Sequence, residues 1–154
     1  MALGTVTAFK SARDLVGVGG PIGESSATLG VFGSSLDPKQ VTTLIGVEPT
    51  ESFRAGFRRG PRSPAMKHGA WFLEERGILP EGPTAALRRL RLRVPDSAQF
   101  WEQLRARYSV QVRLTLHLEE WSSGFSLSPD LVAWLNLLGV GLEMEIFSNG
   151  DTDA

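Results

Sequence analysis

The segment from Val110 to Glu119 alternates apolar and polar residues at every position. Successive side chains of a β-strand point to opposite faces of the sheet, so this pattern predicts a strand that is apolar on one side and polar on the other. The apolar set is Val110, Val112, Leu114, Leu116 and Leu118, and the polar set is Gln111, Arg113, Thr115, His117 and Glu119. Such a strand buries one face under a second layer and leaves the other face in water.

Two proline-started helices are indicated elsewhere in the chain. Asp37-Pro38 and Ser128-Pro129 each place a capping residue before a proline, which suits the first helical position because it has no amide hydrogen to leave unpaired. Glycines at 46 and 139 mark the expected helix ends. The likeness between residues 35–47 and 126–140 suggests a duplicated strand–helix–strand unit, although chance recurrence of these common signals explains it equally well.

The remaining elements are assigned from periodicity and turn signals. Strands are expected at 27–33, 70–74 and 142–147, and Asp96 to Gln99 resembles a capping box before a helix that runs to Tyr108. Residues 84–94 fit a helix or a strand, and a helix that frays near Leu92 is preferred. Residues 51–68 read as a long loop.

The two ends of the chain carry weaker patterns. Residues 5–9 suggest a short strand and residues 12–16 a turn of helix, before a glycine-rich stretch at 17–23. We therefore expect a poorly defined extension at 1–26, a single α+β domain at 27–147 and an acidic tail at 148–154. The predicted fold has two layers: an antiparallel or mixed sheet of four to five strands, with helices packed on one face and the long loop along an edge or the open face.

Composition excludes several kinds of chemistry. The 154 residues contain no cysteine, which rules out disulfides, cysteine zinc fingers, iron–sulfur clusters and a thiol nucleophile. No apolar run reaches the ~18 residues of a membrane span, and the first residues lack the pattern of a signal peptide. A cytoplasmic protein that does not enter a membrane is therefore expected.

No catalytic constellation stands out among the polar residues. His68 and His117 are the only histidines, and the sequence has neither a P-loop nor a Gly-x-Ser-x-Gly turn. His117 lies on the polar face of its strand, where a neighbouring strand could bring Glu143 or Glu145 opposite it. An ordinary cross-strand pair is favoured there over a metal site. We expect no catalytic residue, no metal and no cofactor.

Positive charge is concentrated in the middle of the chain. Residues 51–93 contain ten basic and four acidic residues, whereas residues 94–154 contain three basic and nine acidic ones. Within the loop, arginines alternate with phenylalanines, which predicts contact with an anionic ligand or an acidic protein surface. The candidate binding residues are Arg54, Arg58, Arg59, Arg62, Trp71 and His117, although core packing is the general expectation for the four tryptophans. Nucleic acid is not an expected partner, and pairing of the arginines within the chain remains open.

Several segments together resemble a bacterial family of domains of unknown function, DUF4279. They are Leu36 to Thr50, Gly69-Ala-Trp71 after the basic loop, Gly124 to Leu131, Leu138-Gly-Val140, and Glu143-Met-Glu-Ile146. The resemblance spans residues 27–147 and implies an α+β fold, but no activity or catalytic residue.

Three functions are compatible with these observations. The preferred one is a non-catalytic binding or protein-interaction module, such as a small protein that neutralises a partner protein. The alternative is a small enzyme or sensor that grips a phosphate or carboxylate with an arginine of the loop, with His117 or Glu143 as general base in the enzyme case. A third is homodimerisation through an open sheet face, and the sequence leaves the oligomeric state unknown.

Overall fold

The computed structural model describes residues 22–77, 81–119 and 124–148. The strand and helix predicted at 5–9 and 12–16 lie outside these residues. In chain order the elements are β1 (Ile22–Gly33), α3 (Pro38–Ile45), β2 (Glu51–Phe53), β3 (Gly69–Gly77), α4 (Gly82–Arg93), α5 (Ala98–Arg107), β4 (Ser109–Leu118), α6 (Pro129–Leu138) and β5 (Leu142–Ser148). None of these helices is long and apolar enough to cross a bilayer.

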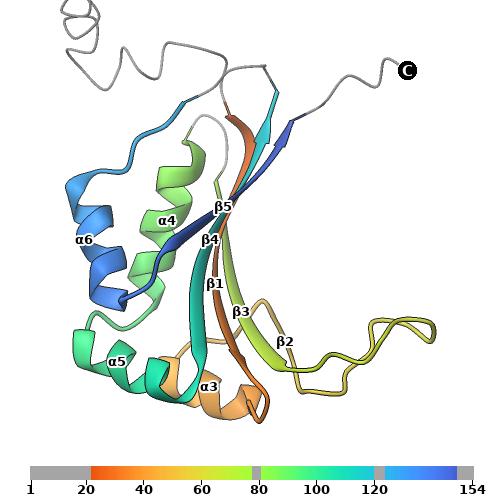
Figure 1. Cartoon of the computed structure of the whole chain (residues 1–154). Coiled ribbons are helices and arrows are strands. Elements are labelled where there is room, and N and C mark those ends of the chain that lie inside the picture. Colours follow the sequence, from red (N-terminus) through yellow and green to blue (C-terminus); the bar gives the residue numbers. More distant parts are fainter. Residues whose placement is uncertain (1–21, 78–80, 120–123, 149–154) are drawn as a thin grey trace, which may run out of the picture.

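The strands form one mixed sheet in the order β2-β3-β1-β4-β5. β1 is antiparallel to both β3 and β4, β2 is antiparallel to β3, and β5 is parallel to β4. The helices lie on one side of this sheet (Figure 1). The predicted fold class, a two-layer α+β protein with helices packed on one face, is therefore confirmed.

The central strand begins earlier than the sequence suggested. β1 starts at Ile22 instead of residue 27, and its pairing with β4 shifts register between Ile22 and Ser25. Gly23 lies where an added Cβ would be 2.8 Å from the side chain of Glu119. This glycine lies inside a strand and lets another residue approach the backbone closely. Composition alone cannot distinguish such a glycine from one that belongs to a loop.

The ambiguous segment at 84–94 is part of a helix. α4 ends at Arg93, one residue past Leu92, so the preferred assignment, a helix that ends near Leu92, is confirmed. Leu87 and Leu90 are fully buried, while the side chain of Leu92 is 85% exposed. Leu90 and Leu92 therefore lie on different faces, as helical geometry requires and a strand would not allow.

Predicted capping residues are found at three helix ends. The Asp37 carboxylate accepts a hydrogen bond from the Lys39 amide at 3.1 Å at the start of α3, and Gly46 and Gly139 end α3 and α6 with φ of 86° and 68°. The start of α5 differs from prediction, because Ser97 rather than Asp96 is the capping residue. Its hydroxyl accepts a hydrogen bond from the Phe100 amide at 3.3 Å.

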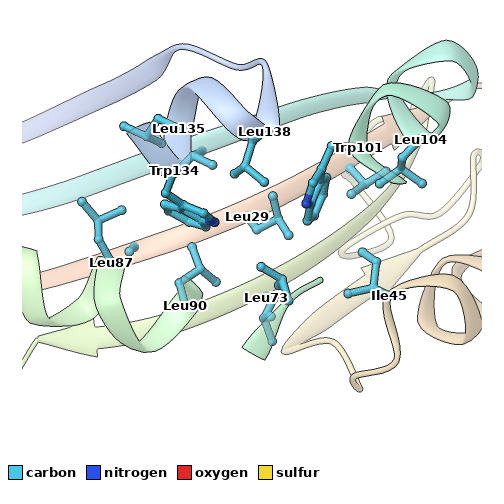
Figure 2. Close-up of a cluster of buried hydrophobic side chains, with 14 of the residues drawn as sticks. Leu29, Ile45, Leu73, Leu87, Leu90, Trp101, Leu104, Trp134, Leu135 and Leu138 are labelled. Atoms are coloured by element: carbon cyan, nitrogen blue, oxygen red, sulfur yellow. The ribbon is translucent and has the colours of Figure 1, made fainter. Parts of the chain in front are cut away.

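A single core joins the helices to the sheet. Figure 2 shows Trp134 of α6 and Trp101 of α5 beside Leu29 of β1, with Leu87 and Leu90 of α4 nearby. All five of these side chains are at most 2% exposed. The large indole rings bridge the gap between the helix layer and the sheet, where aromatic groups contribute much of the buried apolar area.

The two proposed strand–helix–strand units share their connectivity but not their position in the sheet. β1 and β2 run in the same direction with β3 between them, whereas β5 lies directly beside the parallel strand β4. A further difference from prediction concerns the long loop, because its first residues form the short strand β2. The loop proper covers residues 54–68 and is called the arginine loop below.

Candidate binding surface

The side of the sheet opposite the helices is called the open face. A hollow of about 380 Å³ lies on it over the three central strands. Gly30 is one of its lining residues and leaves room for two aromatic rings: an added Cβ would lie 2.9 Å from the ring of Phe32 and 3.4 Å from that of Phe72. The residues that line it are Ser26, Thr28, Gly30, Phe32, Phe72, Glu74, Gln111, Arg113 and Thr115.

Four phenylalanines form a continuous row on this face, which is called the phenylalanine row below. Phe57 of the arginine loop stacks on Phe53 of β2 with ring centroids 5.2 Å apart, and Phe53 lies 6.3 Å from Phe72 of β3. Phe72 meets Phe32 of β1 edge to face at 5.4 Å. Because Phe57 is 43% exposed, the row presents apolar surface to water at the end that lies in the loop.

The arginine loop is folded as a hairpin. The Gly56 amide donates to the Met66 carbonyl at 2.7 Å, and the Met66 amide donates to the Phe57 carbonyl at 2.8 Å. Gly56 has a φ of 90°, a conformation that side-chain-bearing residues rarely adopt. The loop projects from the β2–β3 end of the sheet, away from the helices (Figure 1).

Three of the four candidate arginines have partners within the chain. Arg54 pairs with Asp37 at 2.8 Å and Arg59 with Glu51 at 2.9 Å, with the two arginine side chains 64% and 55% exposed. Such exposed pairs are worth at most about 1 kcal/mol, so either arginine can exchange its partner.

The other two candidate arginines lie at the tip of the hairpin. Arg58 donates to the Ser63 carbonyl at 2.9 Å. Arg62 is exposed and makes no ion pair with another described residue. Pairing of the arginines within the chain, which the sequence left open, is therefore found for Arg54 and Arg59. Neither arginine at the tip has an ion pair with a described residue.

Trp71 belongs to the core and not to this surface. Its side chain is fully buried, and its indole N–H donates to the hydroxyl of Thr42 on α3 at 3.0 Å. A ligand on the open face has no access to it. The structure thus separates Trp71 from the arginines with which the sequence grouped it.

His117 is on the open face, as predicted, but its neighbours differ from those expected. In the parallel register of β4 and β5 it lies opposite Phe147, and the two rings stack with centroids 5.0 Å apart. Glu143 and Glu145 contact Arg113 instead, at 3.2 and 3.6 Å. Sequence alternation predicts the face of each side chain, but only the register decides which residues face each other.

The two histidines lie in different hollows. His117 borders one of about 560 Å³ together with Glu24, Glu74 and Glu119. His68 is exposed and borders another, which it shares with Tyr108. Among the described residues, no group of three or more histidine or acidic side chains is placed to hold a metal ion.

Sequence reasoning missed half of the phenylalanine row. The interleaved Phe53 and Phe57 drew notice, whereas Phe32 and Phe72 were read as ordinary strand residues. A signal was present in β1: Ala27, Leu29 and Val31 form its buried set, so Phe32 falls on the face that is otherwise polar. An aromatic residue out of phase with the buried set marks apolar surface on the open side.

Fold and surface together define a class of protein: a small α+β protein with one face of its sheet covered by helices and an aromatic row on the other. The chain belongs to the family described as Domain of unknown function (DUF4279), whose model matches residues 23–149. Neither the curated proteins nor the solved structures contain a significant match.

Proposed function

We propose that this protein is a non-catalytic protein-binding module that works in the cytoplasm and binds its partner with the phenylalanine row and the arginine loop. The observation that supports this most is the row itself: four aromatic side chains in mutual contact on the face that none of the described helices covers. A partner suited to this surface has apolar side chains surrounded by acidic ones. Neutralisation of another protein is one use of such binding.

The chemistry of the row suits protein recognition. Aromatic and arginine side chains are enriched among the residues that contribute most to protein–protein affinity. The hollow beside Gly30 offers a place for an apolar partner side chain. Next to the row, Arg59 lies over the Phe53 ring at 5.8 Å and the loop carries three further arginines. These charges favour encounter with an acidic surface and disfavour a basic one.

The alternative, a small anionic ligand or substrate held by the arginine loop, has weaker support. The arginine side chains of this loop are largely exposed, so an anion bound there remains in contact with water and salt. Neither tip arginine has an ion pair with a described residue, and Arg58 already donates to the Ser63 carbonyl. Arg62 is therefore the one tip arginine without a partner among the described residues. A single exposed guanidinium provides little affinity for phosphate or carboxylate.

The test is quantitative affinity capture from cell extract with matched variants. Phe57→Ala removes the exposed end of the row, and a second variant replaces Arg54, Arg58, Arg59 and Arg62 by alanine. Leu92→Ala is the control, because it removes an exposed apolar side chain on α4. A central aromatic contact is typically worth ~2 kcal/mol or more, so Phe57→Ala should lower recovery of the partner about thirtyfold.

Three results are informative. Loss of the same captured protein in both surface variants, with retention in Leu92→Ala, supports the proposal. Unchanged capture by Phe57→Ala and by the four-arginine variant contradicts it. If only the four-arginine variant loses binding, and inorganic phosphate displaces the captured species from the wild type, the anionic-ligand alternative replaces it.

A further inference from the structure

The edge strand β5 is unusually open to pairing. It is hydrogen-bonded in register with β4 from Leu142 to Ser148, without any irregularity. Its other side has no neighbouring strand among the described residues. A row of backbone N–H and C=O groups at such an edge is a template for one more strand.

The two edges of the sheet are protected differently. At the β2 edge only the three residues Glu51–Phe53 are paired, and the arginine loop follows at once. β5 is seven residues long and contains no lysine, proline or glycine. Short length, charged side chains, proline and bulges are the usual devices that prevent edge-to-edge association. Of these β5 has only charge, in Glu143 and Glu145, which disfavours an acidic strand but not a basic one.

β5 carries large apolar side chains that are exposed to solvent. Met144 and Ile146, which lie opposite Leu114 and Leu116 on the helix side, are 53% and 58% exposed. Phe147 on the open face is 45% exposed. An added strand would cover these side chains as well as the backbone.

Charge selects the kind of strand that fits. Glu143 and Glu145 point to the open face and share the single guanidinium of Arg113, so one negative charge of this group is not balanced locally. Along the sequence, the part of the chain that contains β5, residues 94–154, has six more acidic than basic residues. A neighbouring strand with basic side chains on the open face and apolar ones on the helix side complements both sets.

We propose that β5 is a docking edge for a strand of a partner protein in which lysine or arginine alternates with apolar residues. A second copy of this chain is a poorer match. Antiparallel pairing that sets Met144 against Ile146 places Glu145 directly opposite its own copy, and like charges in that position are destabilising. The edge is at the opposite end of the strand order from β2 and the arginine loop, so this inference does not depend on the proposed function.

Synthetic peptides test the inference on the whole protein. A fluorescent octapeptide that alternates lysine with valine should bind, and hydrogen exchange should show new protection in residues 142–148 but not in 51–53. One control peptide has glutamate in place of lysine, and another has the same lysines and valines in two separate blocks. We expect each control to bind roughly fivefold more weakly or worse, because each loses the cross-strand match on one or both faces.

Variants of the protein locate the contact. Changing Glu143 and Glu145 together to glutamine should weaken binding of the alternating peptide several-fold, and Ile146→Ser should do the same. Val132→Ser is the matched control for the latter, because Val132 is 53% exposed on α6. Far-ultraviolet circular dichroism checks that each variant is folded. If a variant does not fold, the comparison of the three peptides on the wild-type protein still tests the inference.

Several results overturn the inference. One is equal binding of all three peptides, and another is binding that adds no protection at 142–148. Protection, in the free monomer, of those amides of 142–148 that point away from β4 would mean that the chain covers this edge itself. A sedimentation mass twice the 16.7 kDa of the chain, with protection at 142–148 that grows with concentration, would mean that a second copy occupies it.

Discussion

Replacing Thr42 by valine tests whether Trp71 is a core residue anchored to α3. The indole N–H of Trp71 is buried and donates to the Thr42 hydroxyl at 3.0 Å. Valine has the shape of threonine but no hydroxyl, so Thr42→Val keeps the packing and leaves the N–H without a partner. What is lost is the hydrogen bond that joins Trp71 of β3 to α3 across the sheet–helix interface.

The loss of stability expected for Thr42→Val comes from the indole N–H of Trp71, which is left without an acceptor. A buried polar group that loses its hydrogen-bond partner destabilises a protein by about 1–3 kcal/mol. Thr43→Val is the matched control one position along the same helix. The Thr43 hydroxyl donates to the Lys39 carbonyl at 3.0 Å on the exposed side of α3, so its removal should cost within about 0.5 kcal/mol.

Urea unfolding followed by circular dichroism measures both free energies. The double variant Thr42→Val with Trp71→Phe removes donor and acceptor together. Its cost should be less than the sum of the two single costs by about 1 kcal/mol. Equal stability of Thr42→Val and Thr43→Val would show that the hydrogen bond is not formed, and the argument for Trp71 as a helix anchor would fail.

Two further predictions concern a charge and a helix face. Hydrogen bonds from Arg88 and Ser128 lower the pKa of Asp130 from 3.8 to about 2. The unfolded chain therefore binds the proton more readily than the folded one, and the free energy of unfolding should fall as the pH drops from about 4 to 2. Asp130→Asn should reduce this dependence of the unfolding free energy on pH. An unchanged slope in the variant would contradict the prediction. On α4, Leu90→Ala should cost about 2–5 kcal/mol and Leu92→Ala almost nothing in urea unfolding, whereas similar costs would argue for a strand.

Much of the fold was accessible from sequence because local patterns carried it. The alternation around Leu114, the caps at Asp37 and Gly46, and the apolar stripe of α6 each reflect a physical requirement within one element. The same reasoning misplaced the start of β1, because a glycine that makes room for Glu119 looks like a glycine that breaks a strand.

The candidate surface was less predictable, for reasons of pairing. Whether His117 lies opposite Glu143 or Phe147 depends on the pairing register of β4 and β5, which a shift of a few residues would change. No local sequence pattern indicates this register. The row from Phe57 to Phe32 is assembled from three strands and a loop, so it exists only once the order of the strands is known. The arginines were visible in the sequence, but Asp37 and Glu51 as their partners were not.

The position of β1 has a consequence for how the chain acquires its structure. β1 is at the centre of the sheet, yet it precedes both strands that flank it: Ala27 pairs with Glu75 on one side and with Leu114 on the other. During synthesis the apolar side chains of β1 stay exposed until most of the polypeptide has left the ribosome. These side chains are Ala27, Leu29 and Val31. Closing such long loops slows folding. The nascent chain should therefore rely on chaperones until β4 emerges, and truncations that end before residue 109 should collect in inclusion bodies.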